Sequence, residues 1–260
     1  MKIGLIGCGN IGQFLLESLN MDSFLDGSRI DAVFVRDKKG YEDLANRCRT
    51  RLYDDFQAFL QSDTDLIIEA ATVQSVKQYA PDILRHGKDI LIISVGALAD
   101  RSFFEELKAL SELNGRKIYL PSGAIGGLDV LKAAQSTGQL ESVTLTTRKP
   151  ASSLTDEPVE SEQVLFDGPA FEAISQFPKN INVSIILSLA GIGAEKTRVK
   201  IVADPHVNKN IHAIEAKGDF GKLTLNVENN PMPKNPKTSY LAALSVLSAL
   251  KNSHDWLEIG

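Results

Sequence analysis

The sequence predicts an α/β protein, in which a doubly wound parallel sheet is combined with an inserted α+β domain that has a mixed sheet. Three observations support this fold class. The chain opens on an apolar run that is followed at once by closely spaced glycines. Short apolar runs then alternate with amphipathic stretches, as in consecutive βαβ units. Beyond about residue 125, strand-like segments follow one another with short turns, which is typical of a partly antiparallel domain.

The first predicted strand leads directly into a glycine turn. In "MKIGLIGCGNIG" an apolar run precedes Gly7, Gly9 and Gly12, and "IGQFLLESLN" continues with apolar residues at helical spacing. Strand, glycine turn and helix in this order are the context that the Gly-x-Gly-x-x-Gly dinucleotide motif requires. Its glycines make the tight turn, let the backbone approach a pyrophosphate, and allow close packing of helix on strand. We therefore expect a Rossmann-type domain whose cofactor-binding residues at this turn are Gly7, Gly9, Asn10, Ile11 and Gly12.

The second predicted strand, "RIDAVFVRD", ends at Arg36 and Asp37. Asp37 follows Gly12 by 25 residues, close to the spacing at which a carboxylate in such domains binds the adenosine ribose hydroxyls. The alternative is a surface aspartate that caps a turn. The Arg36 guanidinium can stack on adenine or hold a 2′-phosphate. The sequence thus predicts NAD as the cofactor and leaves NADP as a tolerated alternative.

Strands and helices continue to alternate beyond this point. The runs "DLIIEAAT" (65–72) and "DILIISVGALAD" (89–100) are predicted to be buried strands. Each is followed by an amphipathic stretch that reads as a helix, closed by Gly87 and Gly115 respectively. Because ligands of open parallel sheets bind outside the carboxyl ends of the strands, the breaks after the strands are expected on one edge, the cofactor crevice. Those breaks lie at 7–12, 70–73, 94–98 and 121–127.

The second half of the chain has a different pattern of predicted strands and helices. "ESVTLTTRKP" and "EQVLFDG" read as strands, and "GPAFEAISQFP" and "INVSIILSLAGIG" read as helices. Three further strands, "KTRVKIVADP", "NKNIHAIEAKG" and "FGKLTLNVEN", are joined by short turns and predict an antiparallel meander within a mixed sheet. We expect a dinucleotide-binding domain at 1–120 and a substrate and catalytic α+β domain at 121–236. The closing helix at 237–252 is expected to return to the first domain.

Composition and charge exclude several classes of function. The net charge is −5 with signs interspersed, so no basic stripe points to nucleic acid. The longest apolar stretch is too short to span a bilayer, and a strand that begins at Lys2 leaves no room for a signal peptide. The two cysteines cannot form a disulfide framework, and no Cys/His cluster has zinc spacing. We expect a cytoplasmic enzyme without metal.

Several longer motifs resemble one family. The segments "GCGNIG", "SVGALAD", "PSGAIGGLDVL", "FPKNINVSIILSLAGIG", "VADP" and "NIHAIEAKGDFG" occur in an order that resembles L-aspartate dehydrogenases over nearly the whole chain. The resemblance implies NAD(P)-dependent oxidative deamination of L-aspartate to iminoaspartate, which hydrolyses to oxaloacetate and ammonia. It also implies a homodimer, and iminoaspartate that can feed NAD biosynthesis. The second domain should be like those of homoserine dehydrogenase and dihydrodipicolinate reductase.

The same resemblance assigns roles to three residues of the second half. Ala124 in "PSGA" and Asn182 in "NINV" match NAD-contacting positions, and His212 in "NIHAI" matches the catalytic histidine. Each has a structural alternative. Ala124 can belong to a tight turn, and Asn182 can be a helix N-cap, with Asn180 as a near neighbour. The two interpretations of Asn182 are compatible, because an N-cap also directs helix N–H groups at a ligand.

His212 is the strongest candidate among four histidines. Strand alternation places it on one face with Ile214 and Ala216, so a partly buried core histidine is the structural alternative. An imidazole with a pKa near 6.5 suits the proton transfers that amine oxidation and imine hydrolysis require. The other three were interpreted as surface or turn residues: His86, His206 and His254.

Two questions stay open at the level of sequence. A non-catalytic NAD(P)-binding sensor, or a related reductase of a lysine- or threonine-pathway intermediate, is an alternative function. A dicarboxylate substrate calls for cationic or multi-donor anchors, and the sequence does not rank the candidates. They are Arg148, Lys149, Lys179, Lys209, Lys237, Ser122 and Thr238.

Overall fold

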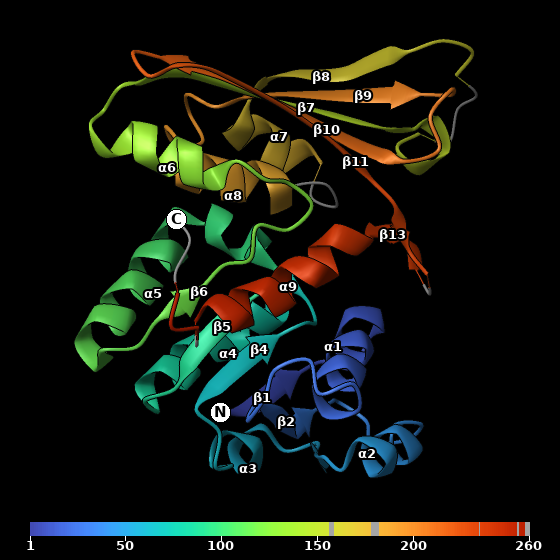
Figure 1. Ribbon diagram of the computed structural model, residues 1–260, viewed down its shortest axis with the longest axis vertical. Coiled ribbons are helices and arrows are strands. Elements are labelled where there is room, and N and C mark those ends of the chain that lie inside the picture. Colours follow the sequence, from blue (N-terminus) through green and yellow to red (C-terminus); the bar gives the residue numbers. More distant parts are fainter. Residues whose placement is uncertain (156–158, 178–181, 234, 254, 258–260) are drawn as a thin grey trace. The chain divides into compact units, whose positions relative to one another are not determined.

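The computed structural model describes residues 1–155, 159–177, 182–233, 235–253 and 255–257 (Figure 1). The chain divides into two compact units. Unit 1 comprises Met1–Pro121 and Val246–Leu257, and unit 2 comprises Ser122–Ser245. The last helix, α9 (Tyr240–Asn252), begins in unit 2 and ends in unit 1. The predicted combination of a parallel α/β sheet with a second, mixed sheet is confirmed.

Unit 1 is built on a six-stranded sheet in the order β3-β2-β1-β4-β5-β6, in which every pair is parallel. The strand order reverses between β1 and β4, and this reversal is where open α/β sheets bind ligands. The strands are β1 (Lys2–Ile6), β2 (Arg29–Phe34), β3 (Arg51–Tyr53), β4 (Leu66–Glu69), β5 (Asp89–Ile92) and β6 (Ile118–Tyr119).

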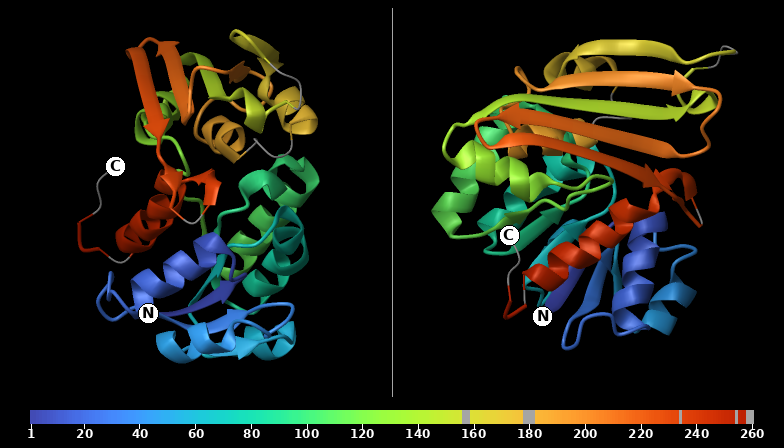
Figure 2. Two further views of the ribbon diagram at one scale, coloured as in Figure 1. Left: turned by 90° about the vertical axis from the view of Figure 1, so that its right-hand side faces the viewer. Right: turned by 45° about the horizontal axis from the view of Figure 1, so that its top comes forward.

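Helices bury both faces of this sheet (Figure 2). On one face Leu15, Leu16 and Leu19 of α1 pack with the apolar side of α9 against β1, β2 and β4. On the other face Phe59 fills the space beside Gly4, and aromatic rings of β2, α3 and α4 contact one another. The helices are α1 (Asn10–Asn20), α2 (Glu42–Cys48), α3 (Phe56–Leu60), α4 (Val73–Arg85), the 3-10 helix η1 (Val95–Ala99) and α5 (Arg101–Asn114).

Local signals in the sequence account for the ends of α4 and α5. α4 and α5 end where predicted, with Gly87 at φ +70° and Gly115 at φ +60°. The predicted strand at 89–100 is too long, because β5 ends at Ile92 and Ser94 turns away to donate hydrogen bonds to a buried carboxylate. β3, α2 and α3 fall between residues 38 and 64, where we predicted no element.

Unit 2 is a five-stranded sheet in the order β11-β10-β7-β9-β8, covered on one face by three helices (Figure 1). The β7–β9 pair is parallel and the other pairs are antiparallel, so the sheet is mixed as predicted. Its strands are β7 (Leu140–Pro150), β8 (Gln163–Pro169), β9 (Arg198–Asp204), β10 (Asn210–Gly218) and β11 (Gly221–Asn229). Its helices are α6 (Leu128–Ser136), α7 (Ala170–Gln176), α8 (Asn182–Ala190) and the 3-10 helix η2 (Ala151–Ser153).

The predicted meander of the last three strands is wrong. β10 and β11 form a hairpin, but β7 lies between β10 and β9. Burial explains the order: β9 is buried on both faces over Ile201–Asp204 and needs neighbours on each side, whereas β11 is mostly exposed or half-buried, as suits an edge. The proline-rich segment also differs, since β12 (Pro231–Met232) pairs with β13 (Asn235–Ser239) and the closing helix begins at Tyr240 rather than at residue 237.

Candidate active site

The glycine turn of unit 1 has the steric features that the motif predicts. Gly7 has φ +90°, and a Cβ at this position would lie 2.8 Å from the Ala70 carbonyl oxygen. A Cβ at Gly12 would lie 2.4 Å from the Gly7 carbonyl oxygen. At Gly9, by contrast, an added Cβ would meet nothing within 4 Å. Gly7 and Gly12 are therefore required by the fold, and Gly9 leaves open space above the backbone.

The helix that follows this turn begins without a side-chain cap. α1 has Gly9 as its N-cap, and its first turn contains no acidic residue. By contrast, α3, α4 and α5 each have a side-chain N-cap, which is Asp55, Thr72 and Asp100 respectively. Asn10 is exposed and Ile11 is half-buried, so the first N–H groups of α1 and its positive dipole end are open to an anion. This end of α1 fits the phosphates of a dinucleotide.

Arg36 and Asp37 are both exposed and follow β2, the neighbour of β1 in the sheet. Since β1 and β2 are parallel, both residues lie at the same sheet edge as the glycine turn. Asp37 Oδ1 accepts a hydrogen bond from the Lys39 backbone N–H at 2.9 Å. The turn-capping interpretation therefore holds for one carboxylate oxygen. Because the side chain is exposed, the same residue can still bind ribose through its second oxygen.

Sequence reasoning missed Glu69, the last residue of β4. Its side chain is fully buried and accepts hydrogen bonds from the Ala71 N–H at 2.8 Å, the Ser94 N–H at 3.0 Å and the Ser94 hydroxyl at 3.0 Å. Burial raises the pKa of the Glu69 carboxyl, although these hydrogen bonds oppose the rise. Glu69 joins the turns after β4 and β5, and the first of these turns packs against Gly7. The signal in the sequence was an acid that ends an otherwise apolar strand.

Replacing Glu69 with alanine should lower the free energy of unfolding by roughly 2–4 kcal/mol, because three donors would be left unsatisfied in a buried site. Urea unfolding followed by circular dichroism measures this loss. Glu105→Ala is the matched control, since Glu105 is exposed on α5 and should change stability by less than about 0.5 kcal/mol. Equal stabilities of the two variants would contradict the role assigned to Glu69.

His212 lies in unit 2 on β10 and is 3% exposed. The predicted alternation is confirmed: Ile214 and Ala216 are buried on its side of the strand, and Glu215 is exposed. Its Nδ1 lies 3.0 Å from the Thr147 hydroxyl of β7, the residue directly opposite in the sheet. Burial, assisted by the charge of Lys149, lowers the pKa of His212 to about 3, below the ordinary imidazole value near 6.5 on which the sequence argument relied.

Ala124 is connected to the strands that carry His212. The Asn229 side-chain amide donates a hydrogen bond of 3.0 Å to the Ala124 carbonyl, and Asn229 ends β11 opposite Asn210 of β10. Asn229 is 4% exposed, and its Oδ1 makes no hydrogen bond within the described part of the chain. Ala124 is therefore joined by a hydrogen bond to the β10–β11 hairpin, which carries His212. Neither Asn229 nor Thr147 was singled out from the sequence, because an amide or a hydroxyl within a strand carries no distinctive spacing.

Several other residues singled out from the sequence are exposed or lie outside the described part of the chain. Asn182 is exposed and is the first residue of α8, so the N-cap position falls on residue 181, outside the described residues, as does Asn180. His86 and His206 are exposed, as expected, and His254 lies outside the described residues. Of the candidate carboxylate anchors, Lys179 is not described and the side chain of Lys237 is not described.

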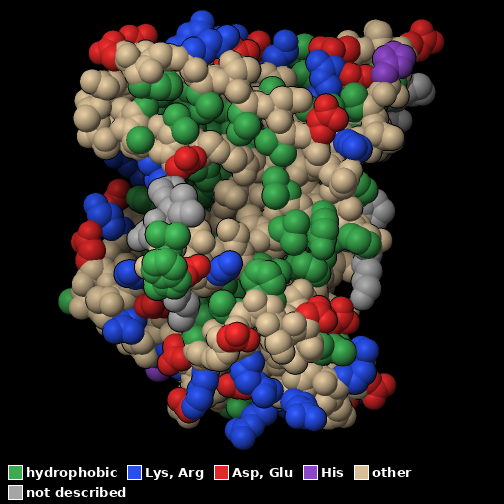
Figure 3. All heavy atoms as spheres, in the orientation of Figure 1, with side chains coloured by type: hydrophobic (Ala, Val, Ile, Leu, Met, Phe, Trp, Pro, Cys, Tyr) green, Lys and Arg blue, Asp and Glu red, His purple; other side chains and the backbone are tan. Residues whose placement is uncertain are grey.

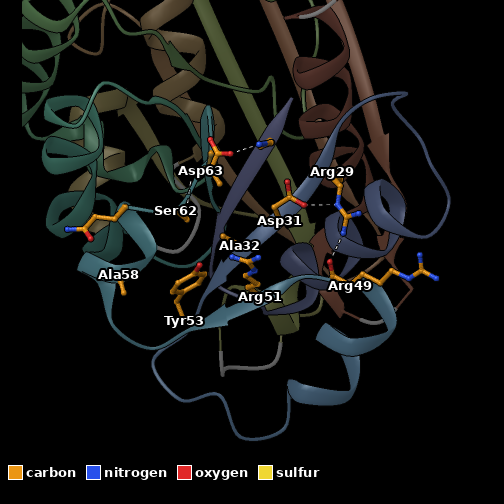
Figure 4. Close-up of a pocket in the computed structure, with 12 residues that line it drawn as sticks. Arg29, Asp31, Ala32, Arg49, Arg51, Tyr53, Ala58, Ser62 and Asp63 are labelled. Atoms are coloured by element: carbon orange, nitrogen blue, oxygen red, sulfur yellow. Dashed lines mark hydrogen bonds and ion pairs between the residues drawn. The ribbon is translucent and has the colours of Figure 1, made fainter.

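A separate hollow of about 610 Å³ lies in unit 1 beside the first residues of β1, β2 and β3 (Figure 4). Some of the charged residues that line it form ion pairs with one another: Arg29 binds Asp31 at 2.7 Å, and Lys2 binds Asp63. The carboxyl ends of these parallel strands, with the glycine turn, lie at the opposite edge of the sheet. This hollow is therefore not the nucleotide crevice.

Surface charge, metal-ligating side chains and helix hydropathy bear on the functions that composition excluded. Basic and acidic side chains are interspersed over the face seen in Figure 3. Among the described residues, no three His, Cys, Asp or Glu side chains are grouped so that they could hold a metal ion. Within the same part of the chain, no helix has the length and apolar character needed to cross a membrane.

Comparison with known proteins covers both units. The family model "Homoserine dehydrogenase, NAD binding domain" matches residues 7–121, and the model "Aspartate dehydrogenase, C-terminal" matches residues 129–253. The L-aspartate dehydrogenase of Methanospirillum hungatei is 46% identical over 260 residues, covering 100% of this chain and 99% of the relative. That of Methanosarcina barkeri is 41% identical, with 100% and 99% covered.

The chain belongs to the L-aspartate dehydrogenase family. The crystal structure of aspartate dehydrogenase from Thermotoga maritima agrees, with a TM-score of 0.83, 32% identity, and 100% of this chain and 99% of that chain covered. Scyllo-inositol dehydrogenase from Lactobacillus casei, at 13% identity and a TM-score of 0.60, shares the fold alone.

Family membership confirms the resemblance inferred from the motifs. It also supports a pyridine nucleotide as the cofactor of this L-aspartate dehydrogenase family member, since residues 7–121 match an NAD-binding domain. The match reaches beyond the glycine turn into unit 2, where His212 and Ala124 lie.

Proposed function

We propose that this chain catalyses the NAD(P)-dependent oxidative deamination of L-aspartate to iminoaspartate, which hydrolyses to oxaloacetate and ammonia. The observation that carries the proposal is the full-length match to L-aspartate dehydrogenases, which includes the unit that holds the buried His212. Supply of iminoaspartate to NAD biosynthesis, a cytoplasmic location and a homodimer remain proposals that follow from the same family resemblance.

The proposed contacts to the nucleotide are those that the motifs assign. The turn from Gly7 to Gly12 and the uncapped end of α1 suit the pyrophosphate, and Asp37 suits the adenosine ribose. In unit 2, Ala124 and Asn182 are the proposed further contacts. A bound nicotinamide would supply the acceptor for the hydride that leaves the aspartate α-carbon.

His212 is the proposed base. Loss of hydride from the α-carbon requires a neutral amine, and hydrolysis of the imine requires a deprotonated water. The low pKa of His212 keeps its imidazole neutral at neutral pH, so a ring nitrogen has a free lone pair, and a bound anion that offsets the Lys149 charge would raise its proton affinity. If Nδ1 donates its hydrogen to the Thr147 hydroxyl, Nε2 carries the lone pair that faces the substrate. Thr147 would then fix the tautomer that the reaction needs.

Replacing Asp37 with alanine should weaken NAD binding more than NADP binding, because the Asp37 carboxylate would bind the ribose diol and repel a 2′-phosphate. KM values for both nucleotides, measured at saturating L-aspartate, give the NAD/NADP ratio. Arg36→Ala should move the ratio in the opposite direction, because its guanidinium can hold the phosphate. An unchanged ratio in the Asp37 variant would show that this carboxylate is not the ribose ligand.

The proposed function is tested by following the formation of NADH or NADPH with L-aspartate, L-homoserine, L-glutamate and L-malate in parallel. Turnover confined to L-aspartate supports the proposal. Preferred turnover of another substrate would favour a related dehydrogenase. Nucleotide binding without turnover of any substrate would favour a sensor, and no rate above background with L-aspartate would overturn the proposal.

A further inference from the structure

Two neighbouring cations of β7 point to opposite faces of the unit 2 sheet. In the β7–β10 register, Thr147 lies opposite His212 and Arg148 lies opposite Ile211. Since side chains alternate along a strand, Lys149 is on the same face as Thr147 and His212, and Arg148 is on the other. The contacts agree, because Thr147 touches His212 while Arg148 binds Glu162 and Asp204.

The face that carries His212, here called the inner face, is otherwise apolar over most of its area. The neighbours of Thr147 on this face include Leu145, Ile201 and Ile214, which are 3% exposed or less. The acidic residues of β8 to β11 all fall on the outer face by the same register: Asp167, Asp204, Glu215 and Glu228. The strands thus place a lysine, and no carboxylate from β8 to β11, beside the buried histidine.

We propose that Lys149 binds a carboxylate of the substrate and so selects a dicarboxylic amino acid at the His212 site. The proposal rests on the proposed function. An ammonium on this face attracts an anion to the side of the sheet where His212 can receive a proton. An ammonium has three N–H donors, so Lys149 can hold a carboxylate and a protein group at the same time.

Electrostatics within the unit agree with this geometry. Burial lowers the pKa of Lys149, and the Lys149 charge contributes to the low pKa of His212. The two groups therefore interact in a poorly solvated setting. A bound carboxylate would offset the Lys149 charge, which stabilises the ammonium and raises the proton affinity of His212 when substrate is present.

Lys149→Met should raise KM for L-aspartate by roughly 10- to 100-fold, because a charge-assisted hydrogen bond to the carboxylate is lost. KM for the nucleotide should stay within about twofold of the wild type. Lys149→Arg retains the charge and should recover part of the loss. Lys200→Met is the matched control, since Lys200 is half-buried on the outer face of β9 and should leave both KM values unchanged.

Binding of succinate in the presence of NAD, measured by isothermal titration calorimetry, separates this proposal from the proposed function. Wild-type binding that is lost in Lys149→Met supports the proposal even if L-aspartate is not oxidised. Oxidation of L-aspartate with the same KM in wild type and Lys149→Met would overturn it and leave the proposed function standing. If Lys149→Met does not fold, Lys149→Gln replaces it, and wild-type KM and succinate affinity in that variant would equally overturn the proposal.

Discussion

Replacing His212 with alanine is expected to lower kcat for L-aspartate by roughly 10²–10⁴-fold, the usual contribution of a general acid–base group. His212 is buried beside Thr147 on a central strand pair, so its imidazole is held in one orientation. The glycine turn, which we propose holds the nucleotide phosphates, belongs to unit 1, so nucleotide affinity should be nearly unchanged. Steady-state kinetics at saturating substrates, with nucleotide binding measured by fluorescence titration, give both quantities.

His206→Ala is the matched control, because His206 is exposed in the turn after β9 and should retain full kcat. The opposite result would change the assignment of His212. If His212→Ala lost thermal stability but kept its turnover per folded molecule, His212 would be a core residue that contributes packing rather than chemistry. Measuring the folded fraction before each assay distinguishes these outcomes.

The low pKa of His212 adds a second readout, which concerns stability. The folded-state pKa of about 3 lies below the value of about 6.5 expected in the unfolded chain. The unfolded state therefore binds more protons between these values, and the contribution of His212 to stability falls as pH decreases from about 6.5 toward 3. His212→Ala removes this contribution, so its stability should depend less on pH between pH 7 and pH 4 than that of the wild type.

The parts of the site that sequence could predict are those encoded by neighbouring residues. The glycine turn, the apolar strand before it and the helix after it lie within twenty residues of the N-terminus, and steric rules connect them directly. Arg36 and Asp37 directly follow a parallel strand, so their position at the carboxyl end of the sheet could be predicted from the sequence. The side of β10 on which His212 lies was likewise set by local alternation.

The parts that sequence could not predict depend on long-range pairing. Thr147 and Lys149 approach His212 only because β7 lies beside β10, although the two strands are more than sixty positions apart in the chain. The predicted meander had instead placed β9 beside β10. The pKa of His212 depends on the burial that this pairing produces. Glu69 escaped notice because a fully buried carboxylate needs three donors from two separate turns, which no local pattern reveals.

Replacing Gly9 with alanine is expected to weaken NAD binding by at least about 10-fold, or about 1.4 kcal/mol, without lowering stability. Gly9 has φ −74°, which alanine adopts readily, and an added methyl group meets no protein atom within 4 Å. That open space is where a pyrophosphate would approach the backbone at the start of α1, so the methyl group obstructs the ligand alone. Dissociation constants from fluorescence titration and unfolding midpoints in urea measure the two effects separately.

Gly12→Ala provides the contrast that makes this prediction specific. Its Cβ would lie 2.4 Å from the Gly7 carbonyl oxygen, so the turn or α1 must shift, which should cost about 1–3 kcal/mol of stability as well as nucleotide affinity. Two glycines three positions apart should thus respond differently, one through the ligand and one through the fold. If Gly9→Ala bound NAD with wild-type affinity, the pyrophosphate could not pass close to Gly9. The glycine turn would then be a packing feature of β1 and α1 rather than the phosphate site.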